Sequence, residues 1–436
     1  MKIAFLTPGA GQMYCGGCLH DHTLVTALNK LGHNAILLPL YLPLKLEEPT
    51  QSNNYPLFFN GINVYLDQYL GIFQKAPKFV RKLTSFKPLT NLISKLSATT
   101  DPADVGDIAV SMLQGAEGKQ RRELEELIDW LETDFKPDVV CLSNSLLLGF
   151  AKRINERLNC PVVCQFQGED IYINSMTVTY RAKVWRMLDE KIKDAHLFIS
   201  PSKYAAVAMR QRLIIPEEKV RVVHNGINVS EFQGDSVVKN KPDKTIGYFA
   251  RMCDEKGLHL LIDAFIELKN RKFHNNLKLK IGGVYLSKDE AYVKSLKQKL
   301  KYAGLLGDVE FYPNVGKKEK IAFYKSVDIF SVPAVLSEAF GLYTIEAIAA
   351  GVPLVLPRHG SFPEIVGETK TGILYAPNFT EYLVTALDRM LNDQNLYHNC
   401  KMNCLTVARE MYDSSVMAKN FIKAIEPVVE TRSSII

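Results

Sequence analysis

Glu338 and Glu346, separated by seven residues, lie in the segment of the chain with the clearest chemical potential, residues 337–347. This segment follows a predicted strand at 328–332 and opens a predicted helix. Gly341 would let a ligand approach the backbone, and free amides near Leu342 would suit a diphosphate. The two carboxylates could face one cleft and accept hydrogen bonds from vicinal hydroxyls, one from a sugar and the other from a ribose. The alternative is an ordinary helix N-terminus whose acidic residues suit the helix dipole.

Two basic residues, Arg251 and Lys256, follow the predicted strand at 245–250. A guanidinium and an ammonium are suitable donors to hold two phosphates and to neutralise a departing nucleoside diphosphate. Taken alone, both residues are typical of solvated surface charges. Together with the glutamate pair they favour a site for a nucleotide sugar.

Short apolar runs alternate with amphipathic, helix-length stretches on both sides of a polar segment at 229–243 that resembles a linker. This alternation predicts βαβ units, parallel sheets and two doubly wound domains in series, with ligands at the carboxyl ends of the strands and a cleft between the halves. The strands expected before the linker are 2–7, 35–40, 138–142, 161–166, 196–200 and 219–223. Those expected after it are 245–250, 277–283, 309–312, 328–332 and 353–356.

Composition fits two globular α/β domains. The chain has 436 residues, 47% of them hydrophobic and 23% charged, and its formal charge of +6 is too small to indicate nucleic-acid binding. No run is long and apolar enough for a membrane span, and the apolar start at 3–6 is too short for a signal peptide. These features favour a cytoplasmic protein.

The motifs resemble those of the retaining glycosyltransferases with the GT-B fold, glycosyltransferase family 4. The family's glutamate pair is matched by Glu338 and Glu346, and its Arg and Lys by Arg251 and Lys256. Three further segments are similar to family loops: Gly16-Gly17, Asn225-Gly226-Ile227-Asn228 (where the last Asn replaces the family's Asp), and His359-Gly360-Ser361-Phe362-Pro363-Glu364-Ile365-Val366.

The resemblance implies a retaining transfer of a sugar from a nucleoside diphosphate sugar to an acceptor hydroxyl, with no cofactor and no metal. Glu338 would bind the donor sugar, Glu346 the ribose, and Arg251 and Lys256 the leaving phosphate. Amides near Phe340, Gly341 and Leu342 would hold the diphosphate. Gly16, Gly17 and Asn225 would also line the donor site.

One position departs from the family pattern. Where family members commonly carry a His-Gly pair in the first domain, this chain has Gln167-Gly168. An amide can hydrogen-bond a sugar hydroxyl, but it cannot carry a proton. If the acceptor needs a protein base, Glu169 and Asp170 are the candidates.

Two further segments leave alternatives open. Cys15 and Cys18 could be structural thiols, a redox or metal-binding pair with His20 or His22, or substrate contacts. Residues 68–100 contain no acidic residue and interleave lysine and arginine with apolar side chains, which suits an anionic membrane surface or a lipid-linked acceptor. The alternative is helices packed on the sheet with a solvated basic face.

We therefore expect an acceptor-side domain at 1–230, with the basic insertion at about 68–100, and a donor-binding domain at 243–411. A last helix within 412–436 would return to the first domain. The expected partners are a nucleotide-sugar donor and an acceptor glycan, lipid or small molecule, and no nucleic acid. The alternatives are a nucleotide-sugar hydrolase or epimerase of the same fold, and a non-catalytic sugar-nucleotide binding protein.

Overall fold

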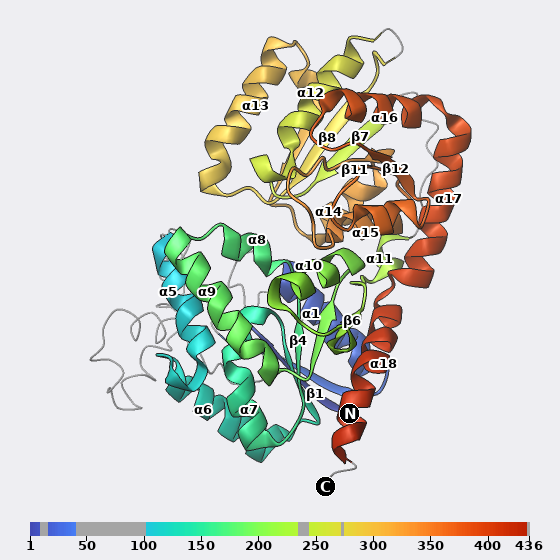
Figure 1. The fold of residues 1–436 in the computed structure, drawn as a ribbon. Helices are drawn as coiled ribbons and strands as arrows, with labels where there is room; N and C mark the ends of the chain where they lie inside the picture. Colours follow the sequence, from blue (N-terminus) through green and yellow to red (C-terminus); the bar gives the residue numbers. More distant parts are fainter. Residues whose placement is uncertain (9–15, 41–101, 234–243, 272–273, 434–436) are drawn as a thin grey trace. The chain divides into compact units, whose positions relative to one another are not determined.

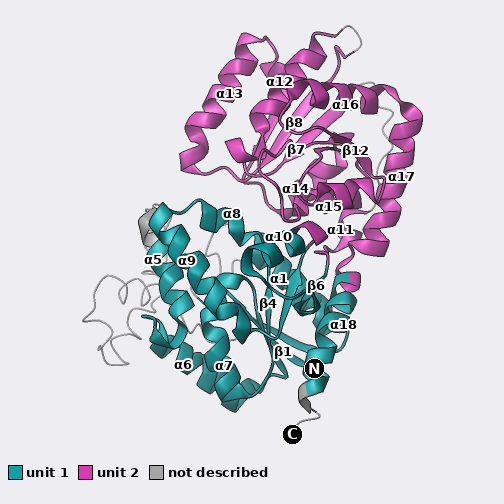
Figure 2. Ribbon diagram, viewed as in Figure 1, with its two compact units in different colours: residues 1–201, 205–223, 417–436 teal, residues 202–204, 224–416 magenta. Residues whose placement is uncertain are grey.

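The structure, a computed structural model, describes residues 1–8, 16–40, 102–233, 244–271 and 274–433. It divides into two compact units (Figure 2). The first comprises Met1–Pro201, Ala205–Val223 and Met417–Ile436, and the second comprises Ser202–Tyr204 and His224–Val416. Cys15 and the basic segment at 68–100 lie outside the described residues.

The first unit contains a six-stranded, entirely parallel sheet with the order β2-β1-β3-β4-β5-β6. Its strands are β1 (Lys2–Thr7), β2 (Asn34–Pro39), β3 (Val139–Leu142), β4 (Val162–Gln165), β5 (Leu197–Ser200) and β6 (Val220–Val222). The helices along this part of the chain are α1 (Gly16–Lys30), α5 (Pro102–Gln114), α6 (Arg121–Trp130), α7 (Ala151–Leu158), α8 (Glu169–Asn174), α9 (Val178–Lys191), α10 (Lys203–Leu213) and, at the other end of the sequence, α18 (Ser414–Ser433).

Helices cover both faces of this first sheet (Figure 1). Successive strand residues point to opposite faces, so Ile3 and Phe5 belong to one core and Ala4 and Leu6 to another. Helices α1 and α18 pack on the first of these faces, and α5, α6, α7, α9 and α10 on the second. Because both faces are buried, the strands appear in the sequence as continuous apolar runs.

The second unit contains another six-stranded parallel sheet, in the order β12-β11-β10-β7-β8-β9. Its strands are β7 (Thr245–Phe249), β8 (Lys278–Gly283), β9 (Val309–Pro313), β10 (Ile329–Phe330), β11 (Leu354–Pro357) and β12 (Gly372–Tyr375). Its helices are α11 (Val229–Phe232), α12 (Leu258–Lys269), α13 (Glu290–Tyr302), α14 (Lys317–Lys325), α15 (Leu342–Ala349), α16 (Thr380–Asn392) and α17 (Gln394–Met411).

Two parallel, doubly wound sheets confirm the fold class expected from the sequence. The eleven expected strands are present, with ends shifted by one or two residues in most cases. Strand β12 was missed, because its four residues follow a turn and only Tyr375 among them is buried. Helix α1 begins at Gly16 although glycine has a low helix propensity, so the sequence alone does not indicate this start. None of the helices in the described ranges is long and apolar enough to cross a membrane.

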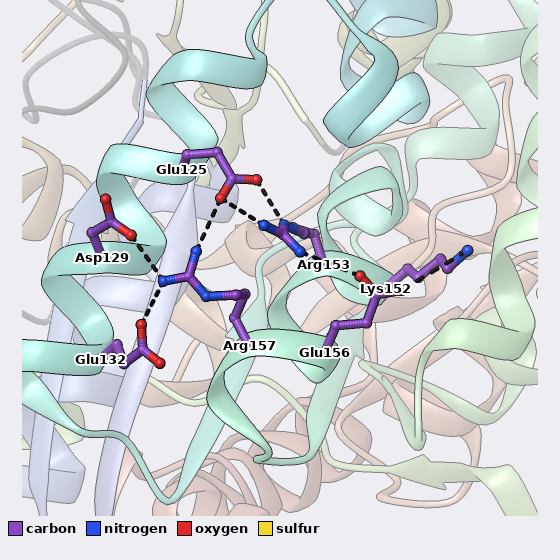
Figure 3. A network of polar contacts seen from close by, with 7 residues as sticks. All are labelled: Glu125, Asp129, Glu132, Lys152, Arg153, Glu156 and Arg157. Atoms are coloured by element: carbon purple, nitrogen blue, oxygen red, sulfur yellow. Dashed lines mark hydrogen bonds and ion pairs between the residues drawn. The ribbon is translucent and has the colours of Figure 1, made fainter.

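A network of ion pairs joins helices α6 and α7 on the surface of the first unit (Figure 3). Glu125 accepts hydrogen bonds from Arg153 at 2.7 and 3.0 Å and from Arg157 at 3.1 Å. Arg157 also contacts Asp129 at 2.9 Å and Glu132 at 2.5 Å. The hydrogen bond from Arg153 is the largest of the effects that hold the pKa of Glu125 below its usual range. Because Glu125 is shared by two arginines, it is the centre of the network.

We expect Glu125→Gln to lower the free energy of unfolding by about 1 kcal/mol at low salt, since it removes a charge from a network rather than from an isolated pair. Glu126→Gln is the matched control, because Glu126 has one longer contact, at 3.4 Å, with Arg122. A carboxylate with a depressed pKa stabilises the fold at neutral pH, and the stabilisation disappears as the pH falls below about 4.5. Urea unfolding at pH 7 and at acidic pH measures the free energy of unfolding of the wild type and of both variants. Equal losses for the two variants at pH 7 would contradict it.

Candidate functional site

The order of strands in the second sheet reverses between β7 and β10. From β7 the chain moves outward to β8 and β9, and it then returns to place β10 on the other side of β7. The loops that leave the carboxyl ends of β7 and β10 therefore diverge, and in open α/β sheets such a switch point is where ligands bind. Arg251 and Lys256 follow β7, and Glu338 and Glu346 follow β10. The topology thus brings these four sequence-predicted residues to one edge of the sheet.

Lys256 and Glu338 form an ion pair across this switch point. Lys256 closes a 3₁₀ turn at Asp254–Lys256, and Gly257, with φ of +68°, then starts α12. A Cβ on Gly257 would lie 1.8 Å from the carbonyl oxygen of Pro333, so a glycine here allows the two loops to touch. The amide of Val335 donates to the carbonyl of Glu255 at 2.9 Å. The loops after β7 and β10 are therefore held together by backbone as well as by charge.

The loop after β11 supports Glu338 from another side. Ser361 donates from its amide to the carbonyl of Glu338 at 3.0 Å and from its hydroxyl to the carbonyl of Phe340 at 2.9 Å. His359 donates to the carbonyl of Ala334 at 2.8 Å. Gly360, with φ of +58°, lies so close that a Cβ there would be 2.6 Å from the amide nitrogen of Glu338. This loop was singled out in the sequence, and its contacts fix the backbone that carries Glu338.

Helix α15 begins at the same edge with unsatisfied backbone amides. Gly341, at its N-cap, has φ of +79°, which favours glycine, and no side chain caps the helix. Thr344 donates to the carbonyl of Gly341 through both its amide and its hydroxyl. The amides of Leu342 and Tyr343 precede the first hydrogen bond of the helix. Neither amide donates a hydrogen bond to another group in the described part of the chain. These free amide donors form a helix N-terminus of the kind that can bind an anion, at the place where the sequence predicts one.

Glu346 lies one turn inside α15 and is held by two residues of α14. Lys320 donates to one carboxylate oxygen at 2.5 Å, and the hydroxyl of Tyr324 donates to the other at 2.9 Å. Burial raises the pKa of Tyr324 well above its ordinary value, so this hydroxyl remains a donor. Sequence reasoning missed both residues. Their i, i+4 spacing marks them as one helix face, but nothing in the sequence shows which carboxylate that face meets.

Arg251 makes a double contact with Asp289, a residue that sequence reasoning also missed. Its guanidinium reaches the two carboxylate oxygens at 3.1 and 3.4 Å. The carboxylate of Asp289 is 7% exposed, whereas the Arg251 side chain is 36% exposed and open to solvent on one side. Asp289 therefore anchors the guanidinium without enclosing it.

Three cations and three carboxylates are paired around this edge: Lys256 with Glu338, Lys320 with Glu346, and Arg251 with Asp289. A diphosphate could be held by the cations and the helix amides, and vicinal hydroxyls by the two glutamates. Phe340 contributes only backbone, because its ring is buried beside Tyr412 and His224. Asn225 is half-buried between β6 and α11, and no recorded hydrogen bond ties it to the other predicted site residues of the described chain.

The remaining predicted residues, Gly16, Gly17 and Gln167, are brought together in the first unit. Gly16 and Gly17 are the first two residues of α1, directly before the buried Cys18. Gln167 lies over Gly17, where a Cβ would be 2.0 Å from the Gln167 side-chain oxygen. The side-chain nitrogen of Gln167 donates to Asp21 at 3.2 Å. The sequence predicted Gln167 and the glycines separately and missed Asp21 between them.

Glu169 is a buried structural carboxylate. It accepts hydrogen bonds from the amides of Ser145, at 2.8 Å, and Gln167, at 2.6 Å, and burial raises its pKa. It therefore fixes the backbone at the end of β4 and has little freedom to take a proton from an acceptor. Asp170, the second candidate base, is half-buried at the start of α8.

The cysteine segment is only partly described. The thiol of Cys18 is buried and lies 3.7 Å from the hydroxyl of Thr7. No group of three metal-ligating side chains converges among the residues that the structure describes, and Cys15 is not one of them.

Two family models match adjacent parts of the chain. "Glycosyltransferase Family 4" matches residues 113–231, and "Glycosyl transferases group 1" matches residues 229–404. Among curated proteins, an uncharacterized glycosyltransferase of Methanocaldococcus jannaschii is 29% identical, over 49% of this chain and 56% of its own length. Mannosylfructose-phosphate synthase of Agrobacterium fabrum is 27% identical, over 43% of this chain and 42% of its own. The matches thus cover about half the length of these relatives.

Solved structures share the fold over the whole chain. The structure of Anabaena HepE in complex with UDP-glucose has a TM-score of 0.66 at 16% identity, covering 100% of both chains. The similarity confirms the GT-B fold expected from the sequence, with its two Rossmann-like sheets.

Gly360→Ala tests the support of the Glu338 backbone. We expect it to lower the free energy of unfolding by about 2–3 kcal/mol, because alanine adopts a positive φ at a cost and its Cβ would collide with backbone. Gly304→Ala is the matched control: Gly304 has φ of +71° and nothing within 4 Å of a Cβ, so about 1 kcal/mol is expected. Urea unfolding compares the two variants. Equal losses would show that the contact with the Glu338 loop is easily relieved.

Proposed function

The chain belongs to the glycosyl transferases of group 1 and family 4, and we propose on this premise that it transfers a sugar from a nucleoside diphosphate sugar to an acceptor hydroxyl with retention of anomeric configuration. One observation carries the proposal: at the switch point of the second sheet, two glutamates, three cations and the free amides of α15 occupy one edge. This combination suits the ribose, the diphosphate and the sugar of a nucleotide sugar.

The ribose, the diphosphate and the sugar of the donor each have protein groups suited to them. Glu346, fixed by Lys320 and Tyr324, accepts hydrogen bonds from the ribose hydroxyls. The amides of Leu342 and Tyr343 hold the diphosphate, and Glu338 accepts from the hydroxyls of the sugar. UDP and UDP-glucose, the ligands named for the HepE structures, are the first donors to consider.

Donor binding would exchange the partners of Lys256. The ammonium is paired with Glu338, and a diphosphate carries more charge than a single carboxylate. As Lys256 turns to the phosphate, the oxygen of Glu338 that it occupied becomes free to accept from a sugar hydroxyl. The ion pair therefore keeps both groups ready without leaving either charge unpaired in a half-buried site.

The transfer itself needs little from the protein beyond positioning and charge. The acceptor oxygen forms a bond to the anomeric carbon, the bond from that carbon to the phosphate oxygen breaks, and the acceptor proton passes to the departing phosphate. Arg251 and Lys256 stabilise the charge that grows on that phosphate. In the first unit, Gly16, Gly17 and Gln167 would contact the sugar. The acceptor is a glycan, a lipid or a small molecule.

The test is a thermal-shift screen with UDP, GDP and ADP, followed by assays of nucleotide release from the corresponding sugars with and without candidate acceptors. Release that depends on an acceptor, with a product of retained configuration, is the expected result. Release without any acceptor would indicate a hydrolase or epimerase. Nucleotide binding with no turnover of any donor would indicate a binding protein.

We expect Glu346→Gln to weaken binding of the preferred nucleoside diphosphate about 10- to 100-fold, because a hydrogen bond to a charged group contributes roughly 1.5–3 kcal/mol. The matched control is Glu381→Gln, an exposed residue in the first turn of α16. Isothermal titration calorimetry measures both. Unchanged affinity in Glu346→Gln would remove the proposed contact with the ribose.

Arg251→Ala and Lys256→Ala should each reduce kcat more than they raise KM for the donor. Phosphate charge grows as the sugar leaves, so these cations help the transition state more than the ground state. Lys294→Ala, which removes an exposed lysine of α13, controls for the general loss of positive charge. A rise in KM with kcat intact would show that the two residues only bind the donor.

A further inference from the structure

A buried carboxylate, Asp21, lies in the first unit and has no part in the roles proposed above. It is fully buried in α1, and burial raises its pKa, against the opposing effects of His20 and of the hydroxyls of Ser143 and Thr7. No lysine or arginine of the described chain is recorded as its partner. A buried carboxylate without a cationic partner lowers stability unless hydrogen bonds compensate for its lost hydration. The hydrogen bonds of Asp21 therefore show what it is there to hold.

The hydrogen bonds of Asp21 join two glutamine amides to one oxygen atom. Its Oδ1 accepts from Gln165 at 3.1 Å and from Gln167 at 3.2 Å. The oxygen of the Gln165 amide faces His20 Nε2 at 3.0 Å, so the histidine donates there. Because Oδ1 accepts from both amides, the nitrogen end of each glutamine side chain faces Asp21. Asp21 thus determines which end of Gln167 points away.

Two further contacts confine Gln167. Its backbone amide donates to Glu169 at 2.6 Å, which fixes the backbone next to Gly168 with its φ of +82°. Its side-chain oxygen lies over Gly17, where a Cβ would be 2.0 Å away, so a side chain at this position would displace the amide. Gln167 is half-buried, whereas Asp21 and Gln165 beneath it are buried. The fixed oxygen therefore belongs to the one member of the cluster that solvent can reach.

The cluster lies where the first sheet has its own switch point. Strand order reverses between β1 and β3, and Thr7, Ser143 and Gln165 stand at or next to the carboxyl ends of β1, β3 and β4. This is the edge at which a doubly wound sheet meets its ligand. An amide of fixed polarity at that edge can distinguish a hydrogen-bond donor from an acceptor.

We propose that Asp21 is a positioning residue that locks the Gln167 amide with its oxygen outward, so that this position accepts a hydrogen bond from a hydroxyl of the transferred sugar. The proposal rests on the glycosyl transfer proposed above. Asp21 itself touches no substrate and acts through Gln167. A free glutamine would present its NH₂ group part of the time, and the hydroxyl would then lose its acceptor.

A double-mutant cycle tests this coupling. The probe is whichever of UDP-, GDP- and ADP-glucose the wild-type protein consumes, and the readouts are kcat and the Kd for the free nucleotide. Asp21→Ala should reduce kcat at least tenfold in the wild-type background and less than twofold in a Gln167→Met background, with nucleotide Kd within twofold throughout. Reductions that multiply independently in the double mutant would overturn the proposal.

Three variants separate positioning from stability. Gln120→Ala removes an equally buried glutamine, which accepts from Ser111 at 2.6 Å, and should lower the melting temperature while leaving kcat within twofold. Asp21→Asn should restore most of the turnover lost in Asp21→Ala, since an amide oxygen can still face both glutamines. If Asp21→Asn is as impaired as Asp21→Ala, acceptor geometry is not what matters and the proposal fails. Asp21→Ser replaces Asp21→Ala in the cycle if the alanine variant does not fold.

The side-chain NH₂ resonances of Gln167 provide a readout that is independent of activity. In ¹⁵N-glutamine-labelled protein, assigned with Gln167→Met, these resonances should be shifted and protected from exchange in the wild type and should lose both properties in Asp21→Ala. Unaltered resonances would overturn the proposal. If the wild-type protein consumes no sugar nucleotide, the glycosyl transfer fails as a function, while the resonances still decide whether Asp21 orients Gln167.

Discussion

The reversal of strand order between β7 and β10 determines where the predicted site residues of the second unit gather. Parallel strands are joined by right-handed crossovers, so a sheet that grows first to one side and then to the other must leave one pair of adjacent strands whose outgoing loops diverge. The loop after β7 carries Arg251 and Lys256, and the loop after β10 carries Glu338 and opens α15. The fold buries the apolar strands, but it leaves polar backbone groups exposed where the loops after β7 and β10 diverge.

The charges at that place are balanced before any ligand arrives. Each of the three cations contacts a carboxylate, and the carboxylates of Glu338 and Glu346 are each only 12% exposed. A half-buried site with unpaired lysines would be costly to fold, and one with unpaired glutamates would repel a diphosphate. Pairing solves both problems. In both units a neighbouring side chain orients a predicted site residue. Tyr324 holds Glu346 in the second unit, and Asp21 holds Gln167 in the first.

The sequence alone was sufficient to predict those features of the structure that depend on local residue patterns. Buried parallel strands are continuous apolar runs, and this is why β1 to β11 could be predicted. Glu338, Glu346, Arg251 and Lys256 could be predicted as site residues because they belong to motifs of fixed spacing. Lys320, Asp289 and Asp21 were not found, since each acquires its role by meeting a residue from a distant element, 26, 38 and more than 140 residues away. Strand β12 was missed because only one of its four residues, Tyr375, is buried.

Helix α18 makes the first unit discontinuous in sequence. Met417, Ala418, Phe421 and Ile425 are at most 1% exposed, and the ring of Phe421 lies 5.5 Å from that of Phe5 in the first strand. The face of the sheet that this helix covers is therefore built from residues at opposite ends of the chain. During synthesis on the ribosome, residues 1–223 emerge before α18, so the part of this apolar face that α1 does not cover stays exposed until the second unit has been translated. The nascent protein would depend on chaperones through that interval, and proteolytic loss of α18 would expose Phe5 and its neighbours to aggregation.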